Sequence, residues 1–114
     1  MTWGVITWYV ALVGAALFCG GTYDLDDAWL ALPVEEFATS GRAQCGDVYA
    51  VWMGGELLYL PARDAGGFGS YCVQDGDTCL DIVADIPQHV FPGPGLSIPG
   101  YIINSEQFRD AIVP

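Results

Sequence analysis

Two aspartates stand apart from the other acids of this chain and are the residues best placed for chemistry. Asp64 ends an apolar run and precedes Ala-Gly-Gly, whereas Asp81 lies inside an apolar run. A carboxylate buried in a strand without a partner is strongly destabilising, so Asp81 requires a groove, hydrogen bonds or Arg63 beside it. If the two carboxyls are neighbours, one has a raised pKa and can act as an acid. The simpler interpretation of Asp64 is a residue that caps a turn.

The other residues that could do chemistry give weaker signals. Acids gather in runs at residues 23–27 and 75–77, and neither run fits the calcium loop, which needs Gly at its sixth position and Glu at its twelfth. The single histidine, His89, has no spacing that supports a Ser-His-Asp or Cys-His arrangement. We therefore interpret the acid runs as solvated loops, and we expect neither a metal nor a cofactor.

The charge balance excludes several classes of function. Three arginines, no lysine and fourteen acids give 3 − 14 = −11. A chain without a basic patch cannot neutralise phosphates, which excludes nucleic acid and disfavours anionic membranes. Without lysine, Schiff-base chemistry and a Walker phosphate loop are excluded as well. A neutral polymer, a cationic partner or a small molecule remains.

The four cysteines predict two disulfides. An even count in a small, glycine-rich chain is typical of an oxidising compartment, and no C-x-x-C pair points to metal; free or metal-bound thiols are the alternative. Cys72 and Cys79 are close enough to close a short acidic loop. Elimination then pairs Cys19 with Cys45.

These residues must be positioned by strands. The chain has 114 residues, the size of one domain (residues 1–114), and 53% of them are hydrophobic. Apolar runs rich in β-branched and aromatic residues alternate with Gly and Pro, which indicates an all-β fold with small helices. The expected strands are residues 3–10, 28–32, 47–53, 56–61, 79–84 and 100–104. Gly54-Gly55 signals a hairpin between two of them.

Three short segments are predicted to be helical. Residues 33–37 begin with proline and carry acids in their first turn, and residues 85–91 begin with Asp85 as a candidate N-cap. Residues 105–112 are the third candidate. Residues 91–100 are expected to form a loop because Gly and Pro are frequent there.

The apolar residues 1–21 have two interpretations. They are hydrophobic enough for a signal peptide or a membrane span, but no basic residue precedes them. Their aromatic and β-branched residues favour a strand instead. We expect a mature-like chain from which any signal was removed, with an uncleaved signal as the alternative.

Several fragments occur in an order that resembles a known group. They are GVITWY, a glycine-rich stretch ending in Cys-Gly, AWLALPVEEF, CGDVYAVW, LPARDAG and CLDIVADI, followed by an apolar segment ending at Phe91. The order is similar to the six-stranded double-psi β-barrel of the expansin, barwin and rare lipoprotein A (RlpA) group. There the pieces read approximately T-W-Y-G, G-A-C-G, A-L-S…F, C-G, V-x-D and H-F-D-L-S…A-F. The resemblance spans residues 4–91 and implies a disulfide-stapled barrel, with a bridge from Cys19 to Cys45.

The resemblance implies a site as well as a fold. Thr7 and Tyr9 match the T-W-Y residues, Asp64 matches the Asp of V-x-D, and Asp81 matches the Asp of H-F-D, with Thr78 nearby. In this group such residues line an open groove. Expansins bind and loosen wall polysaccharide there without hydrolysis, whereas family 45 endoglucanases hydrolyse β-1,4-glucan and RlpA-type enzymes cleave peptidoglycan.

Departures from the group decide between these activities. Val10 and Ala11 stand where the endoglucanases have an Asp, and residues 27–33 lack the histidine of the lytic enzymes. An inverting glycosidase needs a separate acid and base. We therefore expect a secreted, monomeric barrel that binds polysaccharide without hydrolysis. One alternative is an inhibitor or effector that binds a protein, such as a cysteine protease, where the negative charge would favour a cationic partner. The other is a glycan-cleaving enzyme with Asp64 and Asp81 as catalytic residues.

Overall fold

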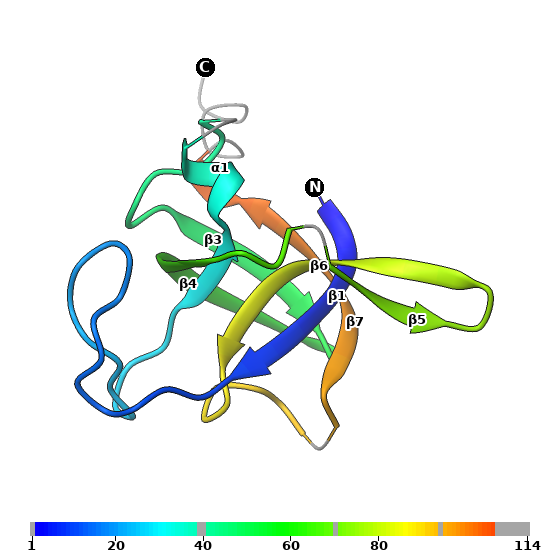
Figure 1. The fold of residues 1–114 in the computed structure, drawn as a ribbon, viewed down its shortest axis with the longest axis horizontal. Coiled ribbons are helices and arrows are strands. Elements are labelled where there is room, and N and C mark those ends of the chain that lie inside the picture. The colour runs from blue at the N-terminus through cyan, green and yellow to red at the C-terminus, as the bar shows by residue number, and fades with distance from the viewer. Residues whose placement is uncertain (1, 39–40, 70, 94, 107–114) are drawn as a thin grey trace.

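The structure, a computed structural model, describes residues 2–38, 41–69, 71–93 and 95–106. These residues form seven strands and one short helix (Figure 1), which confirms the all-β class with little helix. The elements are β1 (Thr2–Tyr9), β2 (Leu30–Pro33), α1 (Val34–Ala38), β3 (Val48–Met53), β4 (Glu56–Gly66), β5 (Cys72–Asp75), β6 (Thr78–Pro87) and β7 (Ser97–Asn104).

Six of the described strands close into a ring. Their order is β1-β7-β3-β4-β2-β6, and β6 pairs with β1 to complete the circuit. The pairs β1/β6 and β2/β4 are parallel, and the other pairs are antiparallel. Strand β5 pairs with β6 as a hairpin that projects from the ring (Figure 1). The double-psi crossing of the connections, which the resemblance implies, stays a prediction.

The interior of the ring holds the main core. Alternate residues of each strand point inward, as the period of two in a strand requires. Burial of one such apolar side chain contributes about 1.5–3 kcal/mol. The buried core residues are Ile6, Leu30, Leu32, Ala43, Tyr49, Val51, Met53, Leu60, Ala62, Val83, Ala84, Ile86 and Ile102. A second, smaller cluster of Leu17, Tyr23 and Trp29 lies within the segment that connects β1 to β2.

Both predicted disulfides are confirmed. Cys19 pairs with Cys45, which ties the β1–β2 connection to the segment before β3, and Cys72 pairs with Cys79. The second bridge staples the β5–β6 hairpin, so the expected acidic loop is a hairpin that contains an additional strand. Two disulfides are consistent with an extracellular protein.

The strands expected from local patterns are present, and several are longer than expected. The β3–β4 turn at Gly54-Gly55 is confirmed, with positive φ angles of 57° and 77° that suit a type I′ hairpin. The strand at residues 3–10 is β1. Strand β4 continues to Gly66 because β2 pairs with that extension, and β7 already begins at Ser97 because it pairs with Thr7.

The predicted helix at residues 85–91 is wrong. Asp85, Ile86 and Pro87 end strand β6, because β6 pairs with the parallel strand β1 up to the register pair Tyr9 and Pro87. Long-range pairing therefore overrides the local capping signal. The helix expected at residues 33–37 is present as α1, and most of the helix expected at 105–112 lies outside the described residues. In the part of the chain that the structure describes, no helix is long and apolar enough to cross a membrane.

Candidate functional site

Four neighbouring strands place four residues in one row across the outside of the ring. Register pairs link Asp64 of β4 to Ala31 of β2, Ala31 to Asp85 of β6, and Asp85 to Thr7 of β1. Paired residues of neighbouring strands lie on the same face of a sheet. The residues on either side of Ala31, Leu30 and Leu32, point into the core, so the row faces outward. We call these four residues, together with Tyr9, the carboxylate row.

The two carboxylates of the row are separated by one strand. Two strand spacings put the Cα atoms of Asp64 and Asp85 roughly 9–10 Å apart. The residue between them is Ala31, whose side chain is a single methyl group. Because the side chain of Ala31 is so small, no bulky group stands between the two carboxyls.

Asp64 is held by a chain of hydrogen bonds. The buried Trp29 donates from Nε1 to the Tyr9 hydroxyl over 2.7 Å, and that hydroxyl donates to Oδ2 of Asp64 over 2.8 Å. The backbone N–H of Phe18 donates to Oδ1 over 2.9 Å. Both oxygens of Asp64 are therefore engaged. Burial, with Asp64 adding to it, raises the pKa of Tyr9 above its usual range, so the hydroxyl keeps the proton that it donates.

Asp85 has a different environment. Thr7 donates from its hydroxyl to Oδ1 of Asp85 over 3.0 Å. Burial, aided by the negative charge of Asp64 and opposed by the hydrogen bond from Thr7, raises the pKa of the Asp85 carboxyl to about 6. Asp85 therefore holds its proton up to about pH 6, well above the ordinary range of an aspartic acid.

Two buried aromatic side chains pack against Tyr9 of the row. The rings of Tyr23 and Trp29 meet edge to face with centroids 5.3 Å apart, and His89 contacts both, at 6.0 Å and 5.8 Å. His89 Nε2 lies 2.5 Å from the carbonyl oxygen of Asp27. His89, which is exposed, reaches these two rings because the segment after β6 follows β1, where the N–H of Gln88 donates to the carbonyl of Tyr9.

The structure brings together part of the site expected from the sequence. Thr7, Tyr9 and Asp64 lie in the carboxylate row, whereas Thr78 lies at the exposed start of β6 and Asp81 is exposed four residues before Asp85. Sequence reasoning missed Asp85. The signal that could have found it is the run D-I-P-Q-H-V-F, which begins at Asp85 and ends at Phe91.

Comparison with known proteins adds no relative. No protein-family model, no curated protein and no solved structure matches the chain. Within the described residues, no group of three or more His, Cys, Asp or Glu side chains is arranged to hold a metal.

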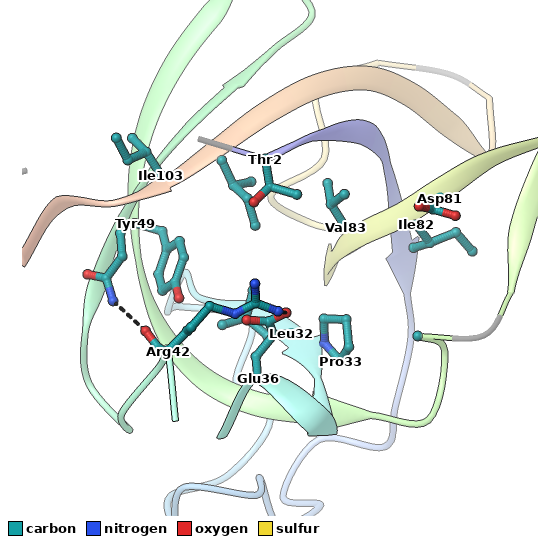
Figure 2. Close-up of a pocket in the computed structure, with 13 residues that line it drawn as sticks. Thr2, Leu32, Pro33, Glu36, Arg42, Tyr49, Asp81, Ile82, Val83 and Ile103 are labelled. Carbon is teal, nitrogen blue, oxygen red and sulfur yellow. Dashed lines mark hydrogen bonds and ion pairs between the residues drawn. The ribbon is translucent and has the colours of Figure 1, made fainter. Parts of the chain in front are cut away.

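A separate pocket of about 210 Å³ lies at the other end of β1, near Thr2 (Figure 2). Arg42 and Glu36 form an ion pair of 2.8 Å in this pocket, and Asp81 lies at its edge. Burial, followed by the Glu36 carboxylate, raises the pKa of Tyr49 to about 12. Asp81 thus faces a different set of side chains from Asp64. The Arg63 side chain, considered as its partner, lies 3.6 Å from Asp27 instead.

Proposed function

We propose that this chain is a secreted, expansin-like protein that binds an extended, neutral wall polysaccharide across the carboxylate row without hydrolysing it. The observation that carries the proposal is the row itself. It sets two carboxylates of unlike environment on the outside of the ring, with the hydroxyls of Thr7 and Tyr9 bonded to them. Hydroxyl and carboxyl groups in a line are suited to the hydroxyls of a sugar chain, because both can exchange hydrogen bonds with them.

The resemblance to the expansin, barwin and RlpA group supports the proposal once the last motif is aligned four residues further along the chain. Asp85, rather than Asp81, fits the Asp of the H-F-D-L-S…A-F piece, because Asp85 lies in the row while Asp81 lines the separate pocket, and the run from either residue ends at Phe91. With this register, the Thr, Tyr and two Asp positions of the group all fall in one row. A ring of six strands is also what a six-stranded barrel requires.

The hydrogen bonds of Asp64 favour binding over hydrolysis. A general base needs a carboxylate oxygen that is free to take a proton from water. Both oxygens of Asp64 already accept hydrogen bonds, from Tyr9 and from the Phe18 backbone. Asp85, with its raised pKa, can donate a proton to a sugar oxygen when protonated. Asp64 is the other carboxylate of the row, so an inverting reaction there would have to use a base that is already bonded to two protein donors.

Sedimentation with microcrystalline cellulose, chitin and peptidoglycan tests the proposal. We expect the intact chain to bind at least one of them, and Asp85→Asn or Asp64→Asn to weaken that binding about tenfold. Asp75→Asn, which removes the same charge from the β5–β6 hairpin, should leave binding unchanged. Reducing ends should not appear. Their release by the intact chain and loss in Asp85→Asn would instead assign a glycan-cleaving enzyme.

One observation favours a second candidate, an inhibitor that binds a protein. The connection between β1 and β2 exposes two apolar side chains at its tip, Leu12 (85% exposed) and Val13 (67%). Hydrogen bonds from Gly14 to Tyr23 and from Ala15 to Leu12 hold the tip in shape. Inhibition of a cysteine protease such as papain, lost in Leu12→Ser and retained in Asp85→Asn, would select this candidate.

A further inference from the structure

The outer face of the ring on the side of β7 carries a row of exposed apolar side chains. Register pairs join Trp3 of β1 to Tyr101 of β7, Tyr101 to Trp52 of β3, and Trp52 to Leu57 of β4. Their exposed fractions are 46%, 42%, 52% and 43% in that order. Three strand spacings make this row roughly 14 Å long.

A second row lies beside the first. It consists of Ile103 of β7, Ala50 of β3 and Tyr59 of β4, again joined by register pairs, and Tyr59 is 63% exposed. We call the two rows together the aromatic face. Between them is a shallow pocket of about 240 Å³ that both rows line.

The composition of the aromatic face is unusual for this chain. The outward side of an antiparallel sheet is normally polar, and the chain has 3 + 14 = 17 charged residues available. None of the seven residues of the aromatic face is charged. A contiguous exposed apolar patch of this kind marks an interaction site.

The charges decide which occupant suits the face. A charged partner would find no side chain there to pair with, and a second copy of the chain would bring another −11 close to the first. Trp and Tyr each have an apolar ring and a polar edge, which match the C–H face and the hydroxyl edge of a pyranose ring. A row of such rings suits an extended chain of sugars.

We propose that the aromatic face is a second binding surface for a neutral polysaccharide, on which successive sugar rings stack. The inference takes the class of polymer, a neutral polysaccharide, from the proposed function. The surface itself is a different one, because none of its residues belongs to the carboxylate row. The row binds by hydrogen bonds, and the aromatic face binds by stacking and burial of apolar surface.

Depletion binding to microcrystalline cellulose and to chitin tests the inference with Trp52→Ser and Trp3→Ser. Both side chains are exposed, so the substitutions are expected to leave the fold intact, which the unfolding temperature verifies. We expect each variant to weaken binding about tenfold, and Trp52→Phe to restore most of it. Tyr71→Ser, at a 65% exposed position off the face, is the matched control and should bind normally.

Each other outcome has a distinct meaning. Unchanged binding by both tryptophan variants overturns the inference. A second result also overturns it: light scattering shows that the intact chain is a dimer, and Trp52→Ser dissociates this dimer but still binds the polymer. The aromatic face would then pair two copies of the chain. If Trp52→Ser weakens binding and Asp85→Asn does not, the inference stands and the carboxylate row is excluded. If Asp85→Asn weakens binding and Trp52→Ser does not, the aromatic face is excluded as a binding surface and the carboxylate row stands.

Discussion

The Tyr9 hydroxyl connects three parts of the candidate site, and its removal should be costly. Tyr9→Phe leaves the Nε1 donor of Trp29, a fully buried side chain, without its acceptor. An unsatisfied buried donor costs about 1–3 kcal/mol, so urea unfolding should show a loss of that size. Tyr59→Phe removes a hydroxyl from a 63% exposed side chain and should change stability by less than about 0.5 kcal/mol. Equal losses in the two variants would contradict the hydrogen-bond chain.

Asp85 should make stability depend on pH. Its pKa is raised from the ordinary value of 3.8 to about 6, so between these values the native protein binds more protons than the unfolded chain. The free energy of unfolding therefore falls as the pH rises through this window. Above it, the native state bears the full cost of a partly buried, ionised Asp85. Two pKa units correspond to about 3 kcal/mol, which solvent screening at this partly exposed site reduces to roughly 1–2 kcal/mol.

Asp85→Asn tests this pH dependence, because asparagine mimics the protonated carboxyl and can still accept the bond from Thr7. We expect the variant to be more stable than the intact chain above pH 6, and the difference to shrink toward pH 4. Urea unfolding at both ends of the window measures it. Asp75→Asn controls for the loss of one charge. A difference of the same size at both pH values would show that Asp85 titrates normally.

At the scale of elements, β7 has no room for a side chain at Gly100, where it lies between β1 and β3. Gly100 pairs with Gly4, and a Cβ on Gly100 would lie 2.5 Å from the carbonyl oxygen of Trp52 and 2.7 Å from Cδ1 of Ile6. Overpacking of this kind costs about 1–3 kcal/mol, so Gly100→Ala should lower the free energy of unfolding by that amount. Gly67→Ala has open space at its Cβ and no positive φ, and should be close to neutral. A neutral Gly100→Ala would mean that β7 can shift away from the Trp52 backbone of β3 without loss.

The elements predicted from the sequence are those that local residues determine. Three such features depend only on residues that are close in sequence. They are the β-branched run of β1, the Gly54-Gly55 turn and the short spacing of Cys72 and Cys79. The position of Asp85 is not local. Its hydrogen bond with Thr7 joins residues 78 positions apart, and Asp85 itself resembles a helix N-cap when only the segment is considered. The site could therefore be predicted in part, and Asp85 was found only through strand pairing.

At the scale of the whole molecule, the net charge of −11 separates the proposed partners. Binding to a neutral polymer forms no ion pairs, so its dissociation constant should change less than about twofold between about 50 and 500 mM salt. For a cationic protein bound to the same chain, the dissociation constant should rise about tenfold or more over that range, because salt screens the attraction. Depletion assays at the two salt concentrations measure the difference. A strong salt dependence with cellulose or chitin would contradict binding of a neutral chain.

The closure of the ring has a consequence for how the protein folds. In the described part of the chain, β1 pairs with β6 and β7, so Val5 lies beside Ile82 and Pro99. Strand β1 can therefore pair only with segments that lie far from it along the chain. Pairings of such large sequence separation slow folding to the range of ~milliseconds to seconds. During that interval the apolar first strand is exposed, so refolding from urea should lose yield as protein concentration rises.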